Sequence, residues 1–381
     1  MKLVAVDHNA VFRAYRRRYG ELARLAGTDV TVVAPEYLDL PHGRQPLQPW
    51  GADERFSLIA ARPVGTFKSH RGFLDPRPLV QAFREAPDLI FLEAEPEAWH
   101  VAECLALRRR TTPRSKVVLT TWSNLNLYAT GFPYRPAFLY RWTYRRALAQ
   151  ADGVLCYASA CEAILRANAF RGATRKVGWG VNTQVFARVR GDAVRTKLAL
   201  RPFTVGYCGR LVEEKGLLVL LDAVARLDRR DAGVLIIGDG PMRTALPALA
   251  ASRGIHLTLI APVDNHELPA YYSAMDVLVL PSLTTRFWKE QFGRVLIEAM
   301  ACSVPVVGSS SGEIPHVIGD AGLVFAEGQA DGLRACLRRI ADDQALRQQL
   351  AAAGRARVEA AFTWEHAAAD MHHFFTGLLG R

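Results

Sequence analysis

Two pairs of charged residues in the second half of the chain have types and spacings that could do chemistry. Arg210 and Lys215 lie near the two ends of residues 209–216 (GRLVEEKG), which follow an apolar run at 204–208. On a loop between a strand and a helix, these cations could converge on one diphosphate, although a surface turn with ordinary charges is the alternative. Glu290 and Glu298 lie further along the chain, and their carboxylates suit hydroxyl groups, such as those of a sugar, better than phosphate.

The two glutamates lie in a segment that is typical of a strand, a loop, a helix and a second strand. Apolar runs occupy residues 277–280 and 304–307, and a helical pattern begins between them at Phe292. The start of this helix would present the backbone N–H groups of Phe292, Gly293 and Arg294, which suit a phosphate. A ligand-free helix with an acidic first turn is the alternative. A glycine-bearing turn at 308–312 follows the next strand at the same edge, and it favours a phosphate-binding site over the ligand-free helix.

Alternating strand and helix patterns run along the whole chain. Apolar runs at 2–6, 30–34, 89–92, 116–120 and 153–156 predict strands in the first half, where residues 41–78 form a less regular, hairpin-like excursion. The second half restarts the pattern at 204–208, after a linker at about 184–202. We therefore expect an α/β protein with two doubly wound, Rossmann-like domains that face each other across a cleft.

The positive charge of the chain belongs to its first half. Residues 1–190 hold 28 Lys and Arg against 16 Asp and Glu, a net charge of +12, whereas residues 191–381 hold 20 against 21, a net charge of −1. A basic domain suits an anionic partner such as a lipid surface, a phosphorylated acceptor or nucleic acid. No nucleic-acid-binding module is recognisable, so we expect no nucleic-acid partner.

Two helical patterns of the first half place arginines beside aromatic residues. The first combines Phe12 and Tyr15 with Arg13, Arg16, Arg17 and Arg18, and the second combines Phe138, Leu139 and Trp142 with Arg141, Arg145 and Arg146. Such helices fit an anionic membrane surface. A solvated basic face over a buried aromatic one is the alternative for each helix.

The remaining composition indicates an ordinary globular protein. The chain has 381 residues and 50% hydrophobic content, enough for two cores. Its six cysteines are scattered without the spacing of a zinc site, so we expect buried free thiols. The N-terminal apolar run is too short for a signal peptide, and no other run approaches the roughly 18 residues of a membrane span. These features predict a cytoplasmic protein, with peripheral association at the inner face of the cell membrane as a further expectation.

Taken together, the segments of the second half resemble the family 4 retaining glycosyltransferases of the two-Rossmann-domain (GT-B) type. The resemblance rests on GRLVEEKG at 209–216, GDGP at 238–241, LPS at 280–282, EQFGRVLIEAMACSVPVV at 290–307, SGEIPHVI at 311–318 and GLVF at 322–325. It implies domains at 1–185 for the acceptor and 200–360 for the nucleotide-sugar donor. It also implies a helix at 361–381 that returns to the first domain.

The resemblance also implies roles for individual residues. Arg210 and Lys215 would hold the donor diphosphate and neutralise the departing nucleotide, Glu290 would contact the transferred sugar, and Glu298 would hold the ribose. Arg210, Lys215 and Glu290 are therefore the predicted catalytic residues. The predicted donor-binding residues are Gly209, Arg210, Lys215, Pro262, Val263, Glu290, Phe292, Gly293, Arg294, Val295 and Glu298. No metal and no cofactor are expected.

Acceptor-side residues are sought at the strand ends of the first half. The candidates are His8, Asn9, Glu93, Glu95, Trp122 and Asn124. The first loop reads Asp7-His8-Asn9 where the family usually carries glycines, and Trp122 stands where many members have a histidine. A lone histidine such as His8 or His100 is more often a structural hydrogen-bonding residue.

The resemblance implies an enzyme that moves a sugar from a nucleotide-diphosphate sugar to a hydroxyl acceptor with retention of configuration. The expected acceptor is a glycan, a lipid-linked molecule or a small molecule, in lipid-linked glycan or cell-surface polysaccharide synthesis. A nucleotide-sugar epimerase of the same architecture and a non-catalytic sugar-nucleotide-binding subunit are the alternatives. Loss of Arg210, Lys215 or a glutamate would mark the binding subunit, and all four residues are present.

Overall fold

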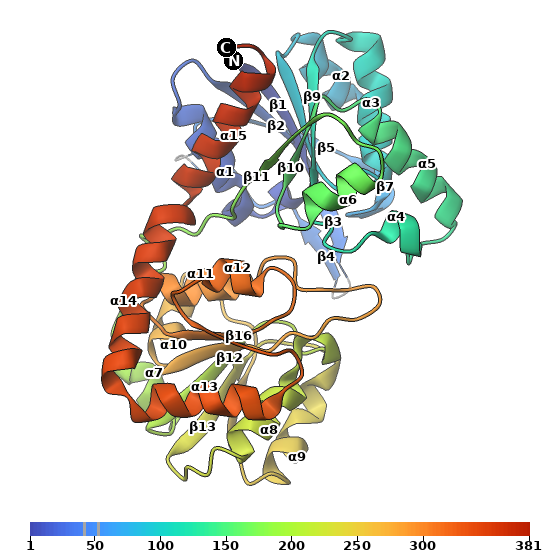
Figure 1. Cartoon of the computed structure of the whole chain (residues 1–381). Coiled ribbons are helices and arrows are strands. Elements are labelled where there is room, and N and C mark those ends of the chain that lie inside the picture. The colour runs from blue at the N-terminus through green and yellow to red at the C-terminus, as the bar shows by residue number, and fades with distance from the viewer. Residues whose placement is uncertain (41–42, 52–53) are drawn as a thin grey trace. The chain divides into compact units, whose positions relative to one another are not determined.

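The computed structural model describes residues 1–40, 43–51 and 54–381 and divides into two compact units. Unit 1 comprises Met1–Gly180 and Trp364–Arg381, and unit 2 comprises Val181–Thr363. Each unit is built on one parallel sheet with helices on both faces (Figure 1). The α/β class predicted from the alternating patterns is therefore confirmed.

The main sheet of unit 1 has seven parallel strands in the order β11-β10-β9-β8-β1-β2-β5. The register runs without interruption from Lys2 opposite Asp29 to Val6 opposite Val33. Both faces of such a sheet are covered, which explains why its central strands are almost continuously apolar. The strands are β1 (Lys2–Asp7), β2 (Asp29–Pro35), β5 (Ser57–Ala61), β8 (Leu89–Glu93), β9 (Lys116–Thr121), β10 (Gly153–Cys156) and β11 (Ala173–Lys176).

The helices of unit 1 cover both faces of this sheet. Helix α15 packs on α1, and α3 packs on α2 and α5 (Figure 1). The helices are η1 (His8–Val11), α1 (Arg13–Arg24), α2 (Pro76–Arg84), α3 (Trp99–Thr111), α4 (Leu127–Thr130), α5 (Ala137–Leu148), α6 (Cys161–Ala167) and α15 (Trp364–Leu378). The last helix is thus part of unit 1 although it follows unit 2 in the chain.

Residues 41–78 are more regular than the sequence indicated. Two hairpins pair β3 (Tyr37–Leu40) with β4 (Gly43–Pro46) and β6 (Pro63–Lys68) with β7 (Arg71–Leu74). Between them β5 joins the main sheet beside β2, so this stretch also contributes an edge strand. Residues 41–42 and 52–53 of the predicted excursion lie outside the described residues.

Unit 2 has a six-stranded parallel sheet in the order β14-β13-β12-β15-β16-β17. Its strands are β12 (Phe203–Cys208), β13 (Ala232–Ile237), β14 (His256–Ile260), β15 (Val277–Leu280), β16 (Val306–Ser309) and β17 (Leu323–Phe325). Its helices are α7 (Asp192–Lys197), η2 (Glu213–Lys215), α8 (Leu217–Ala225), η3 (Pro241–Thr244), α9 (Leu246–Ala251), α10 (Leu268–Ser273), α11 (Arg294–Ala301), α12 (Ile314–Ile318), α13 (Ala330–Asp342) and α14 (Gln344–Ala361). Helix α7 lies within the stretch expected to be a linker.

The structure corrects the expectation that helix α1 presents its arginines on an outer basic face. The Arg16 and Arg18 side chains are buried, whereas Arg13, Arg17 and Arg24 reach the surface of the helix. Buried arginines need acidic partners or carbonyl groups, and both are present here. Arg16 pairs with Glu54 at 2.8 Å and donates to the backbone oxygens of Gln48 and Pro49.

The six cysteines are free thiols, as the sequence predicted. Five are buried, and Cys208 at the end of β12 is partly exposed. They therefore act as small apolar side chains of the two cores.

Candidate functional site

The sheet of unit 2 has a topological switch point between β12 and β15. From β12 the chain moves outward through β13 and β14, and it then returns to the other side of β12 with β15, β16 and β17. At such a point the loops beyond the carboxyl ends of the two neighbouring strands diverge, and open α/β sheets bind ligands there. Residues 209–216 follow β12 and residues 281–293 follow β15. The sheet order therefore places both predicted charged pairs at one edge.

Close backbone contacts hold three loops of this edge together. The amide of Leu283 donates to the carbonyl of Glu214 at 2.8 Å. Gly216 has φ of +68°, and a Cβ there would lie 1.9 Å from the carbonyl oxygen of Pro281. Gly312, after β16, has φ of +59°, and its Cβ would lie 1.9 Å from the carbonyl oxygen of Glu290. Only glycine fits both positions, because each requires a left-handed backbone pressed against a neighbouring carbonyl.

These loops bring Lys215 and Glu290 together. The Lys215 ammonium lies 2.6 Å from Oε2 of Glu290, and the Ser282 hydroxyl donates to the same oxygen at 2.6 Å. The Lys215 side chain is 14% exposed and that of Glu290 is 8% exposed. The ammonium also lies 4.8 Å from the ring centroid of Trp288. A cation held in a mostly buried place can attract an anionic ligand more strongly than a surface lysine.

Arg210 occupies a different environment from Lys215. Its guanidinium pairs with Glu214 at 3.8 Å on the same loop, and its side chain is 63% exposed. Its carbonyl accepts a hydrogen bond from the buried Tyr207 hydroxyl at 2.7 Å, which fixes the backbone but leaves the side chain at the surface. Convergence of both cations on one diphosphate thus stays a prediction.

Helix α11 begins two residues later than the helical pattern indicated. Its N-cap is Gly293 at φ of +82°, Phe292 before it is buried, and Val295 in the first turn is partly buried. Glu298 lies in the second turn with 6% exposure. Its carboxylate accepts from the Tyr272 hydroxyl at 2.8 Å and from Arg294 at 3.2 Å. It is therefore fixed in place as an oriented acceptor.

The sequence did not single out Ser282, Tyr272 and Tyr207, which support the site. Ser282 and Tyr272 orient the two glutamates, and Tyr207 holds the loop that carries Arg210. Ser282 lies within the matching segment LPS, so its motif was the available signal. The two tyrosines belong to apolar stretches, where an aromatic residue is indistinguishable from a core residue.

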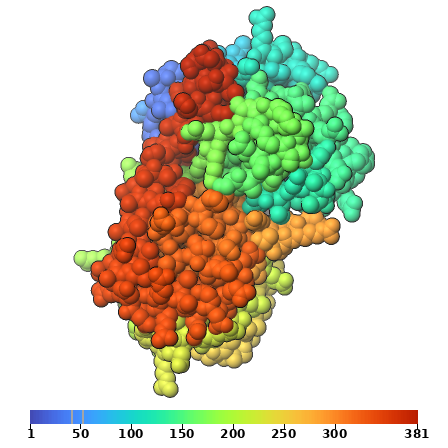
Figure 2. Space-filling model, viewed as in Figure 1, coloured from blue at the N-terminus to red at the C-terminus, as the bar shows by residue number. Residues whose placement is uncertain are grey.

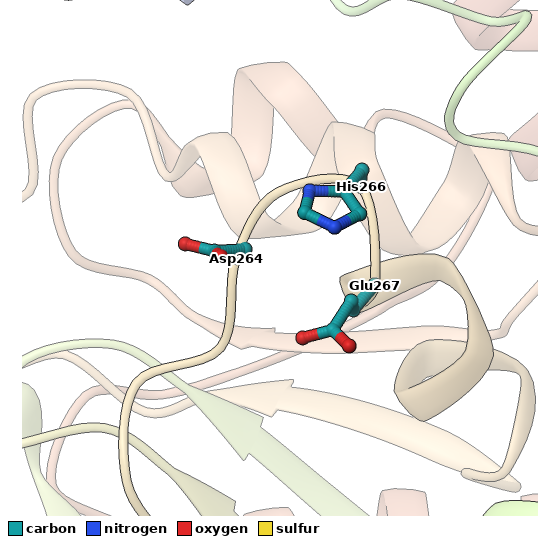
Figure 3. A group of neighbouring side chains, drawn as sticks. All are labelled: Asp264, His266 and Glu267. Atoms are coloured by element: carbon teal, nitrogen blue, oxygen red, sulfur yellow. The ribbon is translucent and has the colours of Figure 1, made fainter.

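Pro262 and Val263 follow β14 on a loop at the same edge of the sheet. Pro262 is exposed and Val263 is partly buried. Further along this loop, Asp264, His266 and Glu267 lie around one tight turn with ligand atoms within 4.8 Å of one another (Figure 3). All three are exposed, and exposed acidic groups commonly occur together without a metal. We assign no ion to this turn, and the expected absence of a metal remains a prediction.

Unit 1 has its own switch point, between β1 and β8, and the acceptor-side candidates lie around it. His8 and Asn9 follow β1, Glu93 ends β8 and Glu95 follows it. Glu93 is 1% exposed, pairs with Arg18 at 3.1 Å and accepts from the Tyr157 hydroxyl at 3.2 Å. Burial raises the pKa of Glu93 to about 7 although Arg18 opposes this shift. The contacts of Glu93 with Arg18 and Tyr157 therefore indicate a structural role in the interior of unit 1.

Glu95 links the loops that follow β8 and β9. Its carboxylate accepts from the Thr121 hydroxyl at 2.8 Å and from the Trp122 amide at 2.7 Å. Burial raises the pKa of Glu95 to about 7. The Trp122 ring stacks on Tyr157 with centroids 3.9 Å apart, and Asn124 nearby is partly buried. These side chains form an ordered polar and aromatic surface at the carboxyl ends of β8 and β9.

Two buried histidines accompany this surface. The His8 and His100 rings lie 5.7 Å apart, and burial lowers the pKa of His8 and lowers the pKa of His100 to about 3. His8 donates to the carbonyl of Glu93, whereas neither ring nitrogen of His100 has a partner among the described residues. His100 therefore lacks, within the described residues, the hydrogen bond that a structural histidine is expected to make. Both imidazoles are neutral at physiological pH.

Comparison with known proteins identifies the fold. Residues 192–357 match the model of the family glycosyl transferases group 1. A sucrose-phosphate synthase from Thermosynechococcus elongatus has a TM-score of 0.73 at 24% identity and covers 100% of this chain and 99% of its own. HepE from Anabaena in complex with UDP has a TM-score of 0.76 at 17% identity and covers 99% and 100%. The fold is GT-B, as predicted.

The resemblance of the second half to this family is likewise confirmed, over residues 192–357. A GDP-mannose-dependent monoacylated alpha-(1-6)-phosphatidylinositol monomannoside mannosyltransferase from Corynebacterium glutamicum is 33% identical over 181 residues, 46% of this chain and 48% of the relative. A 2-deoxystreptamine glucosyltransferase from Streptomyces kanamyceticus is 32% identical over 183 residues, 46% of each chain. The chain spans about half the length of these curated relatives. Membership of family 4 remains a prediction.

Proposed function

We propose that the protein is a retaining glycosyltransferase that moves a sugar from a nucleotide-diphosphate sugar to a hydroxyl acceptor. The observation that carries this proposal is the position of Lys215, whose ammonium lies 2.6 Å from Glu290 at the switch point of unit 2. The matched family and the names of the relatives, one GDP-mannose-dependent, support it. The UDP-bound HepE structure supports a nucleotide donor. Synthesis of a lipid-linked glycan or a cell-surface polysaccharide is the proposed setting.

The proposed division of labour follows from the charges. Lys215 would bind the diphosphate and stabilise the negative charge that develops on it as the bond to the sugar breaks. Glu290 and Glu298 accept hydrogen bonds and would orient sugar and ribose hydroxyls. We propose no metal and no cofactor, and we name no enzymic nucleophile.

Ligand-dependent thermal unfolding tests the donor class. The protein is heated with a panel of nucleoside diphosphates and nucleotide sugars, because a ligand that binds the folded state raises the unfolding temperature. We expect a uridine or guanosine diphosphate species to raise it and the corresponding nucleosides to leave it unchanged. Absence of a shift with every diphosphate would refute the proposal. Product formed from the donor alone would indicate an epimerase.

We further propose that unit 1 binds an anionic membrane surface through α5. Phe138, Leu139 and Trp142 are 68%, 37% and 52% exposed, and Arg141, Arg145 and Arg146 are exposed on the same helix. Helix α5 lies at the outside of unit 1 (Figure 1). Exposed aromatic residues among arginines suit the interface of an anionic bilayer. No helix within the described residues is long and apolar enough to cross a membrane, and the cytoplasmic location stays a prediction.

Vesicle sedimentation tests the α5 surface. We expect binding to phosphatidylglycerol vesicles at low salt, weaker binding at high salt, and none to phosphatidylcholine vesicles. Replacement of Phe138 and Trp142 by Asp should weaken binding roughly tenfold, because it removes apolar contacts and adds like charge. Val64→Asp is the matched control, since Val64 is 61% exposed in unit 1 but lies on β6. Equal binding of both variants would reject this surface.

A further inference from the structure

The loop between β15 and α11 carries an aromatic residue whose place in the site no motif explains. This loop projects from the surface of unit 2 (Figures 1 and 2). Its residue Trp288 is partly buried, unlike the exposed Phe287 before it. The Trp288 ring lies under the Lys215 ammonium, 4.8 Å from ring centroid to nitrogen. The indole therefore contacts the Lys215 ammonium, which the site holds in a mostly buried place.

The backbone of the loop fixes Trp288 in this position. The Thr285 amide donates to the carbonyl of Trp288 at 2.8 Å, and the Trp288 amide donates to the Thr285 hydroxyl at 3.0 Å. The hydroxyl of Thr284, the residue before, bonds to Ser311 at 3.0 Å and to Glu327 at 2.8 Å. The turn is thus closed on itself and tied to the loops that follow β16 and β17.

The contact of Lys215 with Glu290 leaves a role for a second contact, with the indole of Trp288. A lysine side chain has four rotatable carbon bonds and keeps much rotamer freedom unless it is held. The carboxylate of Glu290 holds the ammonium but also neutralises it, and so competes with any diphosphate for the same charge. An indole face attracts the ammonium through its quadrupole without adding a negative charge. It can therefore keep the ammonium in place while a diphosphate takes the place of the carboxylate.

We propose that Trp288 is a positioning residue for Lys215, which holds the ammonium where the donor diphosphate binds. The inference rests on the proposed function of this site and deepens it. The structure supports it with two independent features, the cation–π contact and the closed turn that sets the indole. Trp288 acts through Lys215 and is not itself a catalytic residue.

A double-mutant cycle tests this role, with the dissociation constant of the nucleoside diphosphate that stabilises the wild type as the readout. Trp288→Leu should weaken binding about 3- to 10-fold, the range of one partly shielded cation–π contact. Trp288→Phe keeps an aromatic face and should recover part of that loss. In the Lys215→Met background, Trp288→Leu should change nothing further, because its partner is absent. Phe287→Leu is the matched control on the same loop and should stay within about twofold of wild type.

The outcomes separate the inference from the proposed function. If Trp288→Leu weakens binding equally with and without Lys215, the tryptophan supports the loop only and the inference is overturned. If the wild type binds no nucleoside diphosphate, the proposed function fails. The contact between Trp288 and Lys215 is then tested by the unfolding temperatures of the ligand-free variants. Non-additive shifts for Trp288→Leu and Lys215→Met would uphold the contact, whereas additive shifts would overturn it.

Discussion

Lys215→Ala is expected to remove most of the stabilisation that a nucleoside diphosphate gives the protein, so that binding is measurable only at much higher ligand concentration, and to lower kcat by about 100-fold or more. The reason is the place of the ammonium. It lies 2.6 Å from Glu290 and is 14% exposed, so its charge is only weakly screened by water. Without it, a diphosphate would meet Glu290 with no cation between them. The measurements are the ligand-induced shift in unfolding temperature and single-turnover transfer rates.

Two matched variants make this result specific. Arg226→Ala removes a cation that is 52% exposed and pairs with Asp331 elsewhere in unit 2, and it should leave both measurements unchanged. Arg210→Ala examines the other predicted cation, which pairs with Glu214 and is 63% exposed. A loss comparable with that of Lys215→Ala would show that both cations serve the diphosphate. If a nucleoside diphosphate raises the unfolding temperature of Lys215→Ala as much as that of the wild type, Lys215 does not belong to the donor site.

The strands could be predicted from sequence because apolar runs mark parallel strands directly. The runs at 277–280 and 153–156 coincide with β15 and β10. Both strands are buried along their whole length, so no polar residue blurs their ends. The start of α11 was less predictable, since Phe292 fits the helical pattern but Gly293 takes a left-handed conformation before the helix. Periodicity carries no information about that dihedral angle.

The contacts between the site residues were harder to predict from the sequence than the motifs that contain them. Lys215 and Glu290 are 75 residues apart, and they meet only because the order of the strands places β12 beside β15. Spacing along the chain suggested that Arg210 and Lys215 act together, yet the guanidinium pairs with Glu214, four residues along its own loop. Trp288 gave no signal at all, because its role depends on the turn closed by Thr285.

The arginines of α1 also depend on partners that are distant in the sequence. Arg18 follows aromatic residues on a helical pattern, and that pattern is equally typical of a basic membrane face and of a buried ion pair. What decides between them is Asp7 and Glu93, which come from the ends of β1 and β8. Local sequence contains no trace of the second of these partners. The same segment therefore holds a structural charge inside the unit.

Arg18→Met is expected to lower the free energy of unfolding by about 3–5 kcal/mol, the cost of leaving buried charges without their counterion. Arg18 is 1% exposed, pairs with Glu93 at 3.1 Å and Asp7 at 3.9 Å, and lies 4.7 Å from the Trp179 ring centroid. Arg17→Met is the control on the same helix. Its side chain is 30% exposed with a partner at 3.6 Å, so its loss should cost about 0–1 kcal/mol. Urea unfolding measures both.

The pH dependence of this defect distinguishes lost charge from lost packing. Burial raises the pKa of Glu93 to about 7 while Arg18 opposes the shift, so Arg18→Met should raise that pKa further. A carboxyl group with a raised pKa keeps its proton in the folded state after the unfolded state has lost it. Its contribution to stability therefore falls as pH rises from the unfolded pKa through the folded one. The defect of Arg18→Met should thus be small near pH 5 and grow toward pH 8. A defect of equal size at both pH values would show that Arg18 matters for packing alone.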